Sequence, residues 1–292
     1  MALQPHLQPR QDRLPFAIRT ILFTVLALSL GDAMVKLSGG ALGLAQIFVL
    51  RSAIVAPVLL VLLWRRGERM PLADPFVTLR SLMLVVMWVL YYLSLPHLPL
   101  AAAAAVYYTL PIFITLFSAL FLGSRISRRG WLAVLGGFAG VALILRPQPD
   151  DLNLWALLPL AAAMLYAGAM ILTGTRCRAV PPLALALHLN LGFILGGLLL
   201  LAGPEAPAGA WQAMGGAELR LLAIMAGAIL IGSIGAAIAY TNGPAAVIGS
   251  FDFAYVAFAV LWGLIFFGER PDALALAGIA LVTGSGILAL RS

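Results

Sequence analysis

The chain has 292 residues, of which 63% are hydrophobic and 10% charged, and its formal net charge is +7. Soluble domains have about a quarter of their residues charged, so this composition excludes an ordinary soluble protein. The cationic residues are spread over connecting segments and form no basic patch with interleaved aromatics, which argues against a nucleic-acid partner and for a lipid bilayer. A single cysteine, Cys177, excludes a disulfide framework.

Apolar runs recur along the chain at about 20 residues each, the length that crosses a bilayer as a helix. We therefore predict an all-α, polytopic membrane protein in which the first apolar run is a retained helix, not a cleaved signal peptide. The ten predicted transmembrane helices are 15–37, 43–64, 76–95, 98–122, 129–146, 153–174, 181–202, 217–240, 243–267 and 272–290.

The distribution of arginines predicts the orientation of these spans. With both termini in the cytoplasm, thirteen arginines, Arg80 among them, fall on the inner side, and only Arg146, Arg220 and Arg270 fall on the outer side. Because cytoplasmic segments carry an excess of Lys and Arg, we expect a multi-pass protein of the bacterial inner membrane with cytoplasmic N- and C-termini.

The second half of the chain repeats the first. Residues 97–146 align with residues 242–291 without a gap, so that Phe113 falls on Phe258, for example. The sequence thus predicts two repeats, 15–146 and 153–291, with five spans each. An odd number of spans inserts the second repeat upside down, which gives the inverted topology common in secondary transporters.

The repeated pattern of an early Pro, a small-residue stretch, a G-x-R turn and a Gly-containing final helix resembles the drug/metabolite transporter superfamily. Within it, the chain is similar to the ten-helix group with two EamA-type repeats, which includes the YddG-type amino-acid exporters. The segment Phe266–Pro271 looks like the family's Phe-x-Gly-Glu turn, whereas the first copy has Ser124 where Glu is usual. The resemblance implies a pore between the halves, lined by spans 1–4 and 6–9, with spans 5 and 10 peripheral.

Ionisable residues inside spans are costly and therefore mark candidate functional positions. Asp32 in the first span and Arg51 in the second lie at similar predicted depths and can pair. Lys36 follows Asp32 by four residues, a helical spacing that also permits a pair, and its long stem can reach the interface. Two interpretations remain open: a structural Asp32–Arg51 tie between helices, or a charge or gate exposed to the pore.

Asp252 lies eight residues after Pro244, and its repeat mate is Tyr107. The two equivalent positions therefore hold an acid and a phenol. This makes the two sides of the predicted site chemically different, as the two charged ends of a zwitterionic solute are. The carboxylate can hold an amino group or carry a proton; the alternative is a structural hydrogen bond to the backbone or a tyrosine. His188 is a candidate for proton relay or for a plain interhelical hydrogen bond.

Aromatic residues cluster on the predicted inner spans and offer an amphipathic wall for an apolar or aromatic solute, ordinary helix packing being the alternative. The candidate substrate-binding residues are Tyr92, Tyr107, Tyr108, Tyr166, His188, Tyr240, Asp252 and Phe253. Pro111 and Pro159 are candidate hinges, because Pro frees a backbone carbonyl within a helix. We expect no metal site, no cofactor and no catalytic residues, because neither ligand spacing nor a nucleophile with a base is visible.

We predict a carrier that exports amino acids, large neutral or aromatic ones above all, and related small metabolites by alternating access, with protons as a candidate coupling ion. The same fold also suits another metabolite, such as riboflavin or S-adenosylmethionine. An intramembrane enzyme and a channel are the rivals from other classes, and neither a catalytic set nor a selectivity ring supports them. Small-residue stretches in spans 5 and 10 suit either internal packing or a weak homodimer, so a monomer or a weak homodimer is expected.

Overall fold

The computed structural model describes residues 13–38, 41–71, 74–94, 97, 106–123, 125–145, 155, 157–202, 211–268 and 272–290. All regular structure in these residues is helical, as predicted, and each predicted span corresponds to at least one helix. The helices are α1 (Leu14–Leu37), α2 (Leu44–Arg66), α3 (Pro75–Ser94), α5 (Leu110–Leu122), α6 (Arg128–Leu145), α7 (Leu157–Gly174), α8 (Pro182–Ala202), α9 (Gly216–Asn242), α10 (Ala245–Phe251), α11 (Ala254–Phe267) and α12 (Ala273–Leu290).

Within the described part of the chain, six helices are long and apolar enough to cross a bilayer by themselves: α1, α2, α3, α7, α8 and α9. Shorter apolar helices cover residues 112–122, 257–267 and 276–285. The ninth predicted span is divided into α10 and α11, and the described part of the fourth span becomes a regular helix only at Leu110. Part of the predicted fourth span, residues 98–105, lies outside the described residues. The polytopic all-α prediction is therefore confirmed.

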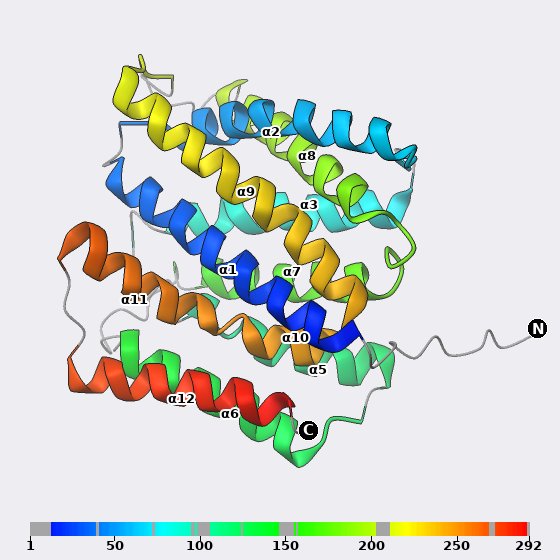
Figure 1. Ribbon diagram of the computed structural model, residues 1–292, viewed down its shortest axis with the longest axis vertical. Helices are drawn as coiled ribbons and strands as arrows, with labels where there is room; N and C mark the ends of the chain where they lie inside the picture. The colour runs from blue at the N-terminus through cyan, green and yellow to red at the C-terminus, as the bar shows by residue number, and fades with distance from the viewer. Residues whose placement is uncertain are drawn as a thin grey trace, which may run out of the picture.

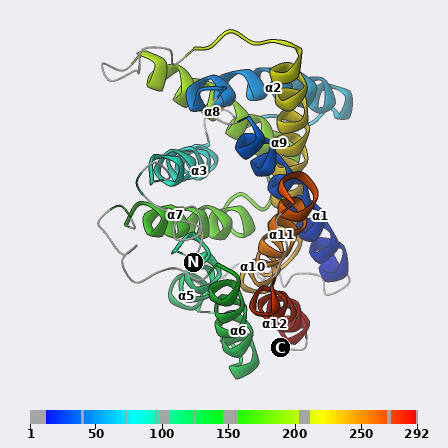
Figure 2. The ribbon, with the colours of Figure 1, turned by 90° about the vertical axis from the view of Figure 1, so that its left-hand side faces the viewer.

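The main helix contacts stay the same when each helix is replaced by its equivalent in the other half. Helix α1 packs along α9 and onto α11; its counterpart α7 packs along α3 and onto α5. The remaining main pairs join equivalent spans, α2 with α8 and α6 with α12. Figures 1 and 2 show α2 and α8 at one edge of the bundle and α6 and α12 at the opposite edge. Between these edges, α1, α9, α10 and α11 lie on one side, and α3, α5 and α7 lie on the other (Figure 2).

The repeated turn is built alike in both halves. Helix α5 ends at Gly123 with φ 62°, and α11 ends at Gly268, the repeat mate, with φ 67°. This left-handed conformation closes a helix C-terminus and favours glycine, which has no Cβ to clash. The G-x-R motif is therefore a pair of equivalent helix stops.

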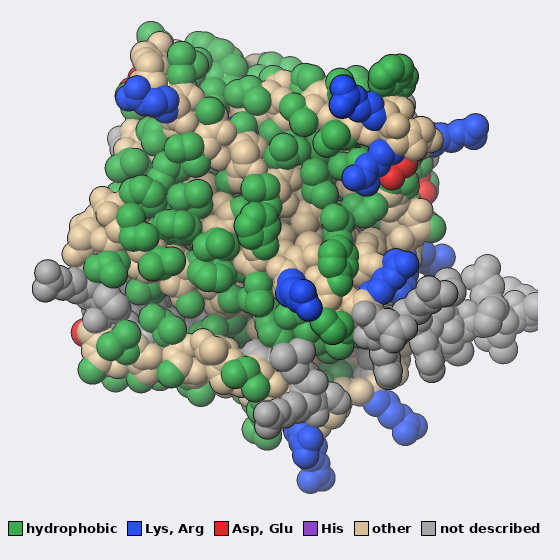
Figure 3. All heavy atoms as spheres, in the orientation of Figure 1, with side chains coloured by type: hydrophobic (Ala, Val, Ile, Leu, Met, Phe, Trp, Pro, Cys, Tyr) green, Lys and Arg blue, Asp and Glu red, His purple; other side chains and the backbone are tan. Residues whose placement is uncertain are grey.

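Polar contacts identify two ends of the bundle. At one end, Arg13 Nη1 donates to Asn242 Oδ1 at 3.2 Å, and the Arg176 guanidinium lies 5.2 Å from the centre of the Phe76 ring. At the other end, the Lys36 ammonium lies 4.5 Å from the centre of the Phe267 ring. Figure 3 shows a broad hydrophobic face, with most visible Lys and Arg side chains near its right-hand and lower edges. We call the end that holds Arg13 and Arg176 the basic end.

Arg80 does not belong to a connecting segment, where the arginine count placed it. It lies six positions into α3, which begins at Pro75, and only 1% of its surface is exposed. The prediction was wrong because the span was taken to start at residue 76 and its first turns were assigned to the aqueous side. Long cationic side chains near helix ends commonly reach the interface, but this one is buried between helices.

Candidate functional site

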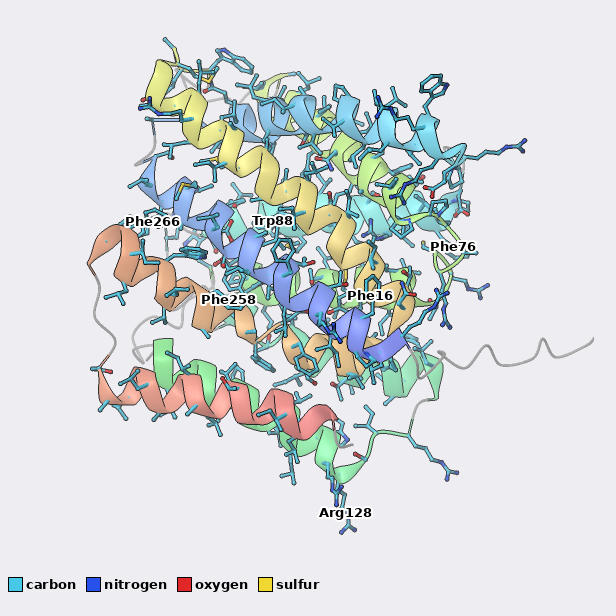
Figure 4. The ribbon with its side chains drawn as sticks, in the orientation of Figure 1. Phe16, Phe76, Trp88, Arg128, Phe258 and Phe266 are labelled. Atoms are coloured by element: carbon cyan, nitrogen blue, oxygen red, sulfur yellow. The ribbon has the colours of Figure 1, made fainter. Side chains whose placement is uncertain are left out.

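A cavity lies between the two sides of the bundle and encloses about 90 Å³ of space open to water-sized groups. A single water needs about 10–15 Å³ by the same measure, so the cavity can hold several waters or part of a small solute. Its ionisable lining residues are Asp32, Arg80 and Asp252, and its aromatic ones are Trp88, Tyr91, Tyr107, Tyr108, Tyr166 and Tyr255. In Figure 4, Trp88 lies in the middle of the bundle, whereas Phe76 and Phe266 lie near opposite edges.

Two interruptions of regular helix border this cavity. The turn at Tyr108 and Thr109 precedes α5, and the turn at Asp252 and Phe253 separates α10 from α11. Both use tighter, i to i−3 hydrogen bonds: Thr109 N–H donates to Val106 O at 3.2 Å, and Asp252 N–H donates to Gly249 O at 3.2 Å. The repeat alignment places Tyr107 on Asp252, so the two turns occupy equivalent positions to within one residue. Helices broken near the middle of a membrane protein commonly mark its binding site.

Asp252 is held by two tyrosines but keeps one free oxygen. Tyr240 donates its hydroxyl to Asp252 Oδ2 at 2.5 Å, and Tyr166 donates to the same oxygen at 3.5 Å. The other oxygen, Oδ1, is buried and has no hydrogen-bond partner in the described part of the chain. A buried acceptor without a partner is costly, so a donor from a solute, or a proton, would be favourable at Oδ1.

Asp32 has an equivalent arrangement on the other side of the cavity. Its Oδ2 accepts a hydrogen bond from Tyr255 at 2.5 Å, and its Oδ1 accepts one from Tyr92 at 3.4 Å. No hydrogen bond or ion pair joins Asp32 to Arg51 among the described residues. The structural tie considered from the sequence is thus made with tyrosine hydroxyls.

Arg51 lies behind the aromatic wall, among aromatic rings. Its guanidinium carbon is 5.0 Å from the ring centre of Phe48, 4.9 Å from that of Phe193 and 5.9 Å from that of Trp88. Its Nε and Nη2 atoms are buried and have no hydrogen-bond partner within the described ranges. Cation–π attraction, about 2 kcal/mol where the cation is desolvated, therefore offsets part of the cost of burying this charge.

The predicted aromatic wall is present and continuous. The rings of Tyr91 and Tyr107 are 5.0 Å apart, those of Tyr107 and Tyr166 6.4 Å, and those of Tyr108 and Tyr255 5.3 Å. Aromatic pairs at such distances stabilise one another and give an apolar surface with hydroxyl groups at its edge. The cavity thus combines aromatic walls with charged groups.

Several predicted site residues lie away from this cavity. His188 is on α8 and does not line it; its Nδ1 is buried without a partner in the described residues. Phe253 is fully buried against Gly137 and Val282, on the side that faces α6 and α12. Lys36 is exposed at the end of α1. Pro111 belongs to the first turn of α5, beside the interruption at Tyr108–Thr109.

Pro159 lies at the third position of α7, so it interrupts no helix. Tyr92 and Tyr240 contact the cavity's carboxylates from behind its lining. The residue that the sequence reasoning missed is Arg80, which lines the cavity. Its position inside an otherwise apolar run was the available signal, because buried arginines in spans are rare and functional.

The helices, the broken spans and the charged, aromatic cavity define a polytopic membrane protein built as a transporter. Residues 15–146 match the model of the EamA-like transporter family. The riboflavin transporter of Rhizobium johnstonii is 32% identical over 68% of this chain and 64% of its own length, so just under two thirds of that relative is covered. The pseudopaline exporter CntI of Pseudomonas aeruginosa strain PAO1 is 29% identical over 93% of this chain and 96% of its own.

The S-adenosylmethionine uptake transporter of Rickettsia felis is 27% identical over half of each chain. One crystal structure of another protein superimposes with a TM-score of 0.81 at 22% identity, covering 94% of this chain and 98% of the other, which supports the fold alone. The EamA-like region and the relatives named as transporters support the resemblance of this chain to the drug/metabolite transporter superfamily. The relatives are named as transporters and not as enzymes.

Proposed function

We propose that this protein exports amino acids, with large neutral and aromatic ones favoured, and related small metabolites across the bacterial inner membrane. The observation that carries the proposal is the free Oδ1 of Asp252, which lies at a helix interruption and belongs to a residue that lines an aromatic cavity. An ammonium group satisfies such a carboxylate oxygen, and an apolar or aromatic side chain fits the tyrosine wall. The name of the pseudopaline exporter supports the outward direction.

Transport would proceed by alternating access between two inverted repeats, residues 15–146 and 153–291. The exchangeable packing of the two halves supports this division, because the main helix contacts of α1 with α9 and α11 have counterparts in those of α7 with α3 and α5. The concentration of arginines at one end favours cytoplasmic N- and C-termini. A monomer or a weak homodimer is consistent with the peripheral position of α6 and α12 (Figure 1).

Riboflavin transport is the second candidate function. The observation that favours it is the aromatic wall, in which Trp88 lines the cavity, stacks on the Tyr92 ring at 5.2 Å and offers a flat surface to a planar solute. The match to riboflavin transporters, at 32% identity, also supports it. The two candidates differ in what they require of Asp252, because riboflavin carries no ammonium group.

Counterflow in proteoliposomes tests the proposal. Vesicles loaded with unlabelled phenylalanine, threonine, methionine, riboflavin or S-adenosylmethionine receive the same compound with a label, with and without a pH step. We expect phenylalanine exchange by the wild type and a loss of at least about tenfold in Asp252→Asn, since a charge-assisted hydrogen bond contributes about 1.5–3 kcal/mol. Asp272→Asn is the matched control, because this carboxylate is exposed at the start of α12.

Exchange of riboflavin or S-adenosylmethionine without any amino acid would overturn the amino-acid assignment. The pH step separates two modes of coupling. If the wild type responds to the pH step and the exchange that Asp252→Asn retains does not, Asp252 becomes the proton carrier, whereas a wild type that ignores the step would be a uniporter.

A further inference from the structure

Arg80 is a buried cation whose hydrogen bonds fix its guanidinium group but occupy only some of its N–H donors. Its Nε donates to Thr173 Oγ1 at 2.7 Å, and its Nη1 donates to Leu185 O at 3.3 Å. Thr173 in turn donates its hydroxyl to Ala169 O at 2.7 Å, so its oxygen is oriented to accept from Arg80. Helices α7 and α8 thereby fix the guanidinium of a residue on α3.

The guanidinium has donors left over. An arginine carries five N–H donors, and the two neighbouring oxygens accept from Nε and Nη1 only. The Nη2 group makes no hydrogen bond to any residue that the structure describes, and no described carboxylate lies within ion-pair distance of Arg80. Arg80 lines the cavity although only 1% of its surface is exposed. A buried charge that has no counter-charge is strongly destabilising, so an anion in the cavity would be bound favourably.

We propose that Arg80 forms an anion-binding subsite of the cavity, which holds a carboxylate or phosphate group of the transported molecule. Planar guanidinium groups bind both anions through paired N–H donors. The inference rests on the proposed function in one respect, namely that the cavity holds the transported molecule. It deepens that function because it assigns one residue, Arg80, to the anionic group of the cargo, which in an amino acid is the carboxylate.

The position of Arg80 indicates the order of contacts. Thr173, which binds Arg80, follows Tyr166, which binds Asp252, by seven residues on α7, or about 10 Å along the helix axis. Arg80 therefore lies nearer the basic end, and Asp252 lies deeper. A solute entering from the basic end meets the cation first, then the aromatic wall, and then the free oxygen of Asp252.

Equilibrium binding to the purified full chain in lipid nanodiscs tests the subsite without relying on transport. The probes are phenylacetate, phenyl phosphate and the neutral phenylacetamide, which share an aromatic body and differ in charge. Affinity is measured by thermal unfolding and by tryptophan fluorescence. We expect the wild type to bind at least one anion about tenfold or more tightly than phenylacetamide, the ratio expected for a charge-assisted hydrogen bond. The more tightly bound anion distinguishes a carboxylate from a phosphate.

Arg80→Gln should reduce this preference to within about twofold, because the anions lose a charge-assisted contact that the neutral phenylacetamide does not make. Arg176→Gln is the control, because Arg176 is an exposed arginine at the same end and does not line the cavity; it should keep the full preference. If Arg80→Gln does not fold, Thr173→Val replaces it. Thr173→Val keeps the charge but removes the oxygen that orients it, and should weaken anion binding by about threefold to tenfold.

A wild type without anion preference, including one that binds none of the three probes, overturns the subsite. So does a folded Arg80→Gln variant that discriminates as the wild type does, or Thr173→Val with unchanged anion affinity. Failure of the amino-acid proposal is seen separately in the counterflow assay. An Arg80-dependent anion preference without phenylalanine exchange would retain the subsite and assign it a different anionic cargo.

Discussion

The hydrogen bond between Tyr240 and Asp252 offers a quantitative test of the site. Tyr240 is fully buried and Asp252 is 4% exposed, and their oxygens are 2.5 Å apart. Hydrogen bonds to charged groups contribute about 1.5–3 kcal/mol in soluble proteins. Polar contacts between membrane helices average only about 0.6 kcal/mol and reach about 1.7, because the unfolded chain in the membrane also finds partners. For a short, buried bond we expect a coupling energy of about 1–2 kcal/mol.

A double-mutant cycle measures this coupling. Tyr240→Phe, Asp252→Asn and the double variant are unfolded reversibly in mixed micelles, and the interaction energy is taken from the four unfolding free energies. Tyr166 provides the matched comparison, because its hydroxyl lies 3.5 Å from the same Asp252 oxygen. Its cycle should give less than about 0.5 kcal/mol, since a contact of this length is a marginal hydrogen bond. Equal couplings for the two tyrosines, or a Tyr240 coupling near zero, would refute the assignment of Tyr240 as the main support of Asp252.

Two further predictions concern packing. Gly235→Ala should lower the unfolding free energy by about 1–3 kcal/mol, because the added Cβ would overlap Thr24 Oγ1 where α9 meets α1. Adding Thr24→Ala to this variant should restore part of the lost stability. A Gly235→Ala variant as stable as wild type would contradict the close contact. Arg51→Met should leave the unfolding free energy within about 1 kcal/mol of wild type or raise it, since two unpaired N–H groups are removed along with the charge. Chemical unfolding checks both, and a loss of about 3 kcal/mol in Arg51→Met would indicate that Arg51 has an anionic partner.

The helical architecture could be predicted because a bilayer leaves a chain few options. A span must satisfy its backbone hydrogen bonds internally and must be about 20 residues long, so hydropathy alone locates it. The interruption at Asp252–Phe253 could not be found this way. No proline lies within it, and both residues keep right-handed helical dihedral angles, with φ −60° and −58°. The change from i−4 to i−3 hydrogen bonding follows from three-dimensional packing, which a local pattern does not contain.

The charged residues show the same limit of prediction from a local sequence pattern. Asp32, Arg51 and Asp252 stood out because charges inside apolar runs are rare. Which partner each one has depends on the rotation of its helix: Asp32 meets the hydroxyls of Tyr92 and Tyr255, while Arg51 meets aromatic rings. Depth along the sequence had suggested a pair because it gives a residue's level in the membrane and not the direction in which its side chain points.

The two carboxylates differ in what their hydrogen bonds connect, and this bears on how the halves could move. Asp252, Tyr166 and Tyr240 all belong to the second half, so this cluster can travel with that half intact. The bond from Tyr255 to Asp32 joins α11 to α1 and therefore crosses between the halves.

Two more contacts cross at the same seam. Trp262 donates to Ser29 Oγ at 2.9 Å, and Lys36 lies over the Phe267 ring. Among the described residues, no hydrogen bond links α5 to α7, the counterpart seam. Polar contacts thus hold the α1–α11 seam, which reaches the end opposite the basic one. A separation of α11 from α1 at this seam would break the Asp32–Tyr255 bond, whereas the hydrogen bonds of Asp252 lie within the second half and would not be crossed by it.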